Sequence, residues 1–125
     1  MSACLRVCLL ALVLFAGASG GGAKAGQFLE AIEDLPLMPG LVELTDRGLA
    51  FDKPGGRIVE AYAQGAVTAA AVRAFYGATL PQLGWQALSP ESFLREGEQL
   101  DVTVLSEAAD GGGGGTLVRF TLRPH

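Results

Sequence analysis

Thr68–Trp85 reads TAAAVRAFYGATLPQLGW, and this stretch predicts one amphipathic helix together with its stop signal. Thr68 precedes the helical run, where its hydroxyl can cap the first turn. Pro81 distorts the last turn, and Gly84 supplies the left-handed position at which a helix ends. The large apolar residues recur at the spacing of one helix face, which must be buried: Val72, Phe75, Tyr76, Leu80 and Leu83.

On both sides of this helix, apolar and polar residues alternate with the period of a strand. The segments with this alternation are Leu41–Thr45, Leu49–Phe51, Arg57–Gln64, Trp85–Leu88, Ser92–Arg95, Leu100–Ser106 and Thr116–Arg123. Short turns such as Asp46–Gly48 and Lys53–Gly56 join neighbouring strands, so these strands pair antiparallel. The alternation leaves open which face of Arg57–Gln64 is inward.

Two features precede the first strand. Residues 27–35 place their apolar side chains on one side and three acidic ones on the other, which predicts a short N-terminal helix that Pro36 stops. Between Pro36 and Gly40 lie Leu37 and Met38, which indicate a segment tucked against the core.

These elements predict an α+β fold with an antiparallel sheet of about five to six strands and one main helix packed on one face. At 125 residues the chain holds a single domain, which we place at residues 26–125. The opposite face of the sheet should be polar and expose Glu43, Thr45, Asp101, Thr103, Arg119, Thr121 and Arg123.

Residues 1–25 have the pattern of a secretory signal peptide. Arg6 precedes the apolar run Val7–Phe15, and a small-residue stretch ends in Ala23-Lys24-Ala25, which predicts cleavage before Gly26. The alternative is a retained membrane anchor, although a span needs about 20 mainly apolar residues and this stretch is rich in Gly, Ala and Ser. Cleavage leaves no stable membrane span and predicts a periplasmic or secreted protein.

Cleavage also changes the chemistry of the chain. It removes Cys4 and Cys8, the two cysteines of the sequence, and with them disulfides, thiol catalysis and thiolate metal sites. It leaves seven basic residues against thirteen acidic ones, a net charge near −6. Such a domain lacks the basic surface that nucleic acid or an anionic membrane requires.

The sequence also resembles a pattern in small exported bacterial proteins of unknown function. The resemblance is carried by Phe75-Tyr76 within the helix, by Leu80–Trp85 at its end, and by the Pro-x-x-Pro-Gly entry at Pro36–Gly40. It covers roughly residues 35–123. The resemblance implies a fold and a compartment, and it implies no activity.

No motif commits the chain to a reaction, a metal or a cofactor. Gly111–Gly115 lacks the following helix and lysine of a phosphate loop and is typical of a hairpin tip. His125, the single histidine, is the last residue, where a general base is poorly held. Acid–base chemistry with two carboxylates needs one of them in an apolar pocket, and the carboxylates of this chain fall in or near turns that should be solvated: Glu91, Glu96, Glu98, Asp101, Glu107 and Asp110.

Two residue sets remain as candidate sites. Tyr62, Tyr76 and Trp85 could line a cleft between helix and sheet for a small apolar or carbohydrate ligand, although core packing is the commoner role of such residues. Arg57, Arg119 and Arg123 could share a face and bind an acidic partner or a carboxylate ligand, although they could also pair with acids on neighbouring strands.

The sequence therefore favours a non-catalytic, exported interaction module of the bacterial envelope, with another envelope protein as its partner and no cofactor. The polar sheet face and the segment Pro36–Gly40 are the expected contact surfaces. The alternative is a binder of a small apolar or carbohydrate ligand.

Overall fold

The structure is a computed structural model, and it describes residues 27–107 and 115–125. The predicted signal peptide and most of the glycine run at Gly111–Gly115 lie outside these residues. The elements, in chain order, are β1 (Leu41–Glu43), β2 (Leu49–Lys53), β3 (Gly56–Gly65), α1 (Ala69–Thr79), the 3-10 helix η1 (Leu80–Leu83), β4 (Gln86–Ser89), β5 (Ser92–Arg95), β6 (Glu98–Ser106) and β7 (Thr116–Pro124).

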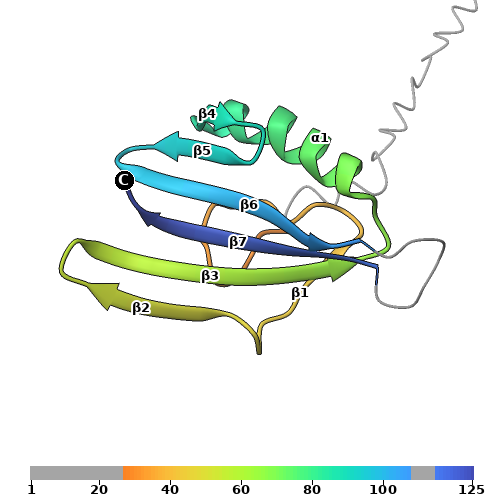
Figure 1. Cartoon of the computed structure of the whole chain (residues 1–125), viewed down its shortest axis with the longest axis horizontal. Helices are drawn as coiled ribbons and strands as arrows, with labels where there is room; N and C mark the ends of the chain where they lie inside the picture. The colour runs from red at the N-terminus through yellow and green to blue at the C-terminus, as the bar shows by residue number, and fades with distance from the viewer. Residues whose placement is uncertain (1–26, 108–114) are drawn as a thin grey trace, which may run out of the picture.

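All seven strands join one sheet, which is larger than the five to six strands predicted. Its order is β1-β3-β7-β6-β5-β4, and every pairing is antiparallel (Figure 1). β2 lies along the same edge of β3 as β1: Glu43 pairs with Ala63 near one end of β3, and Leu49 pairs with Glu60 nearer the other. The long strands β3, β7 and β6 form its centre, so the last strand of the chain lies in the middle of the sheet.

The helix forms as the sequence predicts, within the larger stretch Thr68–Trp85. The Thr68 hydroxyl accepts a hydrogen bond from the Ala71 N–H at 3.0 Å, and the Glu107 carboxylate accepts one from the Ala69 N–H. Pro81 falls in η1, so the helix tightens into a 3-10 turn at its end. Gly84 then takes a φ of 91°, and its N–H bonds the carbonyls of the last turn, as a left-handed cap does.

The core lies between α1 and one face of the sheet. Val72, Tyr76 and Leu80 are the buried helical residues, and the Tyr76 ring meets Phe120 of β7 edge to face at 5.3 Å. The inward strand residues are Val59, Ala61, Ala63, Phe93, Leu100, Val102, Val118 and Phe120. The small side chains of β3 therefore face inward, which answers the question that its alternation left open.

Residues 27–36 do not form the predicted N-terminal helix. The Leu29 N–H donates forward to the Leu35 carbonyl, whereas a helical N–H donates back to the fourth residue before it, and Phe28 and Pro36 make an isolated bridge. Asp34 has a φ of 63°, which a helix does not allow. The apolar spacing was nevertheless informative, because the side chains of Leu29, Ile32 and Leu35 are buried in the core.

The segment Pro36–Gly40 packs against the core, as expected. Leu37 and Met38 are half-buried against the core cluster, and this segment lies on the same side of the sheet as α1. Within the residues that the structure describes, no helix is long and apolar enough to cross a membrane.

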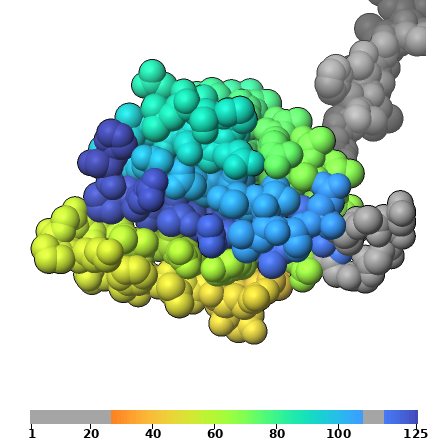
Figure 2. All heavy atoms as spheres, viewed as in Figure 1, coloured from red at the N-terminus to blue at the C-terminus, as the bar shows by residue number. Residues whose placement is uncertain are grey.

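The other side of the sheet, which we call the open face, is covered by no described element. In Figure 2 the strands form most of the visible surface, and α1 borders it. Asp101, Thr103, Arg119, Thr121 and Arg123 lie on this face, as the sequence predicts, and they line a groove there.

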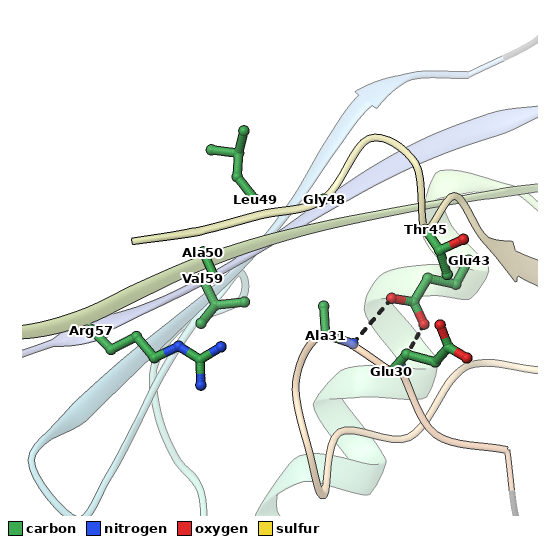
Figure 3. Close-up of a pocket in the computed structure, with 9 residues that line it drawn as sticks. All are labelled: Glu30, Ala31, Glu43, Thr45, Gly48, Leu49, Ala50, Arg57 and Val59. Carbon is green, nitrogen blue, oxygen red and sulfur yellow. Dashed lines mark hydrogen bonds between the residues drawn. The ribbon is translucent and has the colours of Figure 1, made fainter. Parts of the chain in front are cut away.

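Glu43 and Thr45 do not lie on the open face as predicted, because the residues of β1 that point inward alternate in the opposite way to that expected. Leu41 takes the buried position at the start of the strand, which turns Val42 outward, 67% exposed, and Glu43 inward toward the N-terminal loop. Thr45 lies beside Glu43 on that side (Figure 3).

Candidate functional site

Of the three aromatic residues that could line one cleft, Tyr76 and Trp85 belong to the same buried core cluster, and Tyr62 lies apart from them. Tyr76 is in the core, Trp85 is 5% exposed at the start of the β4 hairpin, and Tyr62 alternates with the inward residues of β3 and therefore lies on the open face. Arg47 stands over the Tyr62 ring at 5.5 Å, and Arg95 stands over the Trp85 ring at 4.4 Å. Because the sheet separates Tyr62 from Tyr76, the structure does not bring the set together.

Tyr76 is held by the segment that follows the N-terminal loop. Its hydroxyl donates to the Pro36 carbonyl at 2.8 Å and accepts from the Met38 N–H at 3.2 Å. Burial raises the pKa of this phenol far above its usual value, and the hydrogen bond from Met38 offsets only part of that rise. Tyr76 thus joins the helix to the segment, and nothing in its surroundings points to a ligand.

The three arginines that could share a face are divided between the two faces of the sheet. Arg57 is two residues from the inward Val59 on β3, so it lies on the side of the N-terminal loop. Arg119 and Arg123 alternate with the inward residues of β7 and lie on the open face. Only this pair is brought together.

Arg57 borders a hollow of about 280 Å³ between β2, β3 and the N-terminal loop (Figure 3). At its far end the Glu43 carboxylate accepts hydrogen bonds from the Glu30 and Ala31 N–H groups, at 2.6 and 3.3 Å. These bonds occupy Glu43 in fixing the loop, which is a structural role. Arg57 itself is exposed and points across the hollow.

The open face holds the second hollow, a polar groove of about 310 Å³. Its lining residues come from β3, β5, β6, β7 and the turn before β5: Glu60, Glu91, Ser92, Asp101, Thr103, Arg119, Thr121 and Arg123. The strand registers arrange them in rows across the sheet. One row runs Glu60, Thr121, Asp101, Ser92, and the next runs Tyr62, Arg119, Thr103.

Asp101 is the best-bonded acid of this groove. It accepts hydrogen bonds from the Ser92 hydroxyl at 2.6 Å and from the Gln99 amide at 3.0 Å, and Arg123 pairs with it at 3.2 Å. Three donors from three strands converge on this one carboxylate, so its negative charge is balanced within the protein.

The other two acids of the groove also have partners. The Tyr62 hydroxyl donates to Glu60 at 3.4 Å, and the Arg73 guanidinium of α1 pairs with Glu91 at 3.1 Å. All three carboxylates of the groove are therefore engaged by donors of the chain.

Arg119 is different from its neighbours. It lies between Tyr62 of β3 and Thr103 of β6, and its Nε is buried and has no hydrogen-bond partner among the described residues. The described residues also give it no ion pair within 4 Å. A buried N–H without an acceptor is costly, so this atom marks the part of the groove whose bonding is incomplete.

The arrangement supplies charge and hydrogen bonds. The groove contains hydroxyls, carboxylates and guanidinium groups, and no histidine or cysteine is among its lining residues. Over residues 27–107 and 115–125, no three His, Cys, Asp or Glu side chains are placed together to hold a metal ion. Such a groove can bind and orient a polar group.

The sequence identified only part of this groove. The clean alternation of β7 placed Arg119 and Arg123 on the correct face, whereas Ser92 and Glu60 had no local signal because they join the groove through strand pairing. The sequence left open which face Arg57 takes, and the register of β3 places it on the side opposite to Arg119 and Arg123. Comparisons of the chain with protein-family models, with curated proteins and with solved structures found no match.

Proposed function

We propose that the protein is a small, exported, non-catalytic module of the bacterial envelope, which binds another envelope protein through the open face of its sheet. The observation that carries this proposal is the groove on that face, which no described element covers. A sheet packed by a helix on one side only keeps its second face available for a partner.

The composition of the open face supports a protein partner. Leu49 and Phe51 of the edge strand β2 are 51% and 44% exposed, and their pairing with Glu60 and Ile58 sets them on the same face as the groove. Interfaces between proteins combine exposed apolar side chains with arginine and a polar surround. The open face offers both within neighbouring strands.

Export is proposed from the sequence. The pattern of a cleavable signal peptide is formed by Arg6, the apolar run Val7–Phe15 and the Ala23-Lys24-Ala25 site. The absence of cysteine after residue 25 suits a domain that is stable by packing alone. The mass of the chain recovered from an envelope fraction tests this, because cleavage before Gly26 removes a defined 25-residue segment.

The alternative, a binder of a small apolar or carbohydrate ligand, is less well supported. It required Tyr62, Tyr76 and Trp85 in one cleft, but the sheet separates Tyr62 from the other two, which are buried in the core. We therefore favour the interaction module.

Position-specific photo-cross-linking in intact cells tests the choice of surface. A photoreactive amino acid at Thr121 lies in the groove, and the same amino acid at Ala74 lies on the exposed side of α1 and serves as the control. We expect a discrete cross-linked product from Thr121 and none from Ala74. Equal labelling from both positions, or labelling from Ala74 alone, would contradict the proposal.

A further inference from the structure

The inference concerns Arg119 and rests on the proposed function, because it names the chemistry of the partner that the open face takes. We propose that Arg119 anchors a carboxylate-binding site in the groove, which receives an Asp or Glu side chain from an extended segment of a partner polypeptide.

The first argument is the balance of donors and acceptors in the groove. Glu60, Glu91 and Asp101 each accept from a donor of this chain. Arg119 has no such partner among the described residues, and its Nε–H is buried. The unused capacity of the groove is therefore a cationic donor, and the group that completes it is an anionic acceptor.

The second argument is the shape of the donor. A guanidinium offers parallel N–H groups in a planar fork that matches the two oxygens of a carboxylate. A carboxylate that enters the groove beside Arg119 supplies an acceptor for this guanidinium, whose Nε–H has none among the described residues. The hydroxyls of Thr103 and Thr121 line the same groove and can donate to the outer side of that carboxylate.

The third argument selects an isolated carboxylate on a polypeptide over a highly charged acid. The chain carries a net charge of −4, so a polyanion is repelled at long range. Leu49 stands in the row of Glu60 and Thr121, and beside it lies Phe51, so the groove opens onto an apolar edge. An acidic residue flanked by apolar ones matches both the guanidinium and this edge.

The experiment uses the protein as cells process it from its full sequence, with nitrogen-15 labelling. The probes are two blocked pentapeptides, acetyl-Thr-Val-Glu-Val-Thr-amide and the same peptide with Gln in place of Glu. NMR titration follows the Arg119 Nε–Hε signal. We expect a saturable shift with the Glu peptide and at least tenfold weaker binding of the Gln peptide, a difference of about 1.4 kcal/mol.

Two variants localise the effect. Arg119→Gln should abolish the preference for Glu over Gln, and Arg57→Gln, the same change on the other face, should leave it intact. Comparable affinity of the two peptides for the unchanged protein would overturn the proposal, and this comparison holds even if Arg119→Gln fails to fold. Retention of the preference in a folded Arg119→Gln protein would overturn it as well.

Further arms separate the sources of the anion. Sodium acetate and sodium phosphate are titrated alone, and binding of either as tight as that of the Glu peptide would overturn the polypeptide source. The cross-linking experiment at Thr121 does not depend on the carboxylate. If the unchanged protein binds the two peptides equally well while cross-links from Thr121 persist, the carboxylate site is wrong and the open face is still an interface.

Discussion

Tyr76 is the residue that most tightly couples separate parts of the chain. Its ring packs against Phe75 and Phe120, and its hydroxyl bonds both the Pro36 carbonyl and the Met38 N–H. We expect Tyr76→Phe to lower the free energy of unfolding by about 1–3 kcal/mol, because it leaves two backbone groups without their partner. Urea unfolding measures the loss, and a change below about 0.5 kcal/mol would show that the two bonds contribute little.

Because the Tyr76 phenol is buried, we expect the protein to lose stability at alkaline pH. Burial raises the pKa of Tyr76 in the folded state above its value in the unfolded chain, about 10. The stabilisation is therefore fully present below about pH 10 and decreases as the pH rises above it, because unfolding releases this proton. Thermal unfolding between neutral and strongly alkaline pH should show a steeper fall for the unchanged protein than for Tyr76→Phe. Parallel curves for the two proteins would contradict this.

At the scale of the element, α1 is determined by its own sequence. Thr68 caps its first turn through a hydrogen bond from the Ala71 N–H. We expect Thr68→Ala to cost about 1 kcal/mol and Thr68→Ser to cost much less, since serine keeps the hydroxyl. Circular dichroism during urea unfolding measures both. An equal loss for Ala and Ser would show that the cap bond is not responsible.

A substitution at Gly77 should instead increase the free energy of unfolding. A Cβ at this position meets no atom within 4 Å, so Gly77→Ala keeps the fold and reduces the conformational freedom of the unfolded chain. We expect it to raise the free energy of unfolding by about 0.5–1 kcal/mol. Destabilisation by this substitution would mean that the exposed face of α1 is covered by something else.

The comparison of elements shows what the sequence could predict. The helix and the alternation of β7 depend on neighbouring residues, and both were predicted correctly. The exception is Leu83, which was expected on the buried face and is 40% exposed, because it falls in the 3-10 turn η1 where the period of the α-helix ends. The loop 27–36 depends on Glu43, whose carboxylate takes two of its N–H groups, and Glu43 in turn faces inward only because Leu41 occupies the core. The local spacing of apolar residues does not show which residues distant in the sequence will contact one another.

The candidate site follows the same rule at the scale of the whole molecule. The order β3-β7-β6 brings Glu60, Arg119 and Asp101 to one face from strands that are distant in the sequence. A list of arginines could not show which of them share that face, because β3 and β7 differ in the parity of their inward positions: odd residues in β3 and even ones in β7. The registers, which the sequence does not contain, define the groove.

At one end of the sheet, three glycines from distant segments bring their backbones close together. Gly65 ends β3, Gly40 precedes β1, and Gly115 precedes β7. A Cβ on Gly65 would overlap the Gly40 carbonyl, and a Cβ on Gly115 would overlap the Gly65 carbonyl. The backbones of the three segments thus approach more closely than any side chain permits.

Because of this close approach, we expect Gly65→Ala to be the most damaging small substitution in the sheet. The atom to be accommodated meets backbone on both β1 and the Gly40 turn, which cannot move without shifting the strand pairing of Leu41. We expect a loss of about 3 kcal/mol or more in the free energy of unfolding. Gly55→Ala in the β2–β3 turn is the matched control, since a Cβ there meets nothing within 4 Å. A loss of similar size in both variants would mean that backbone flexibility, and not the close approach of the three segments, requires glycine at position 65.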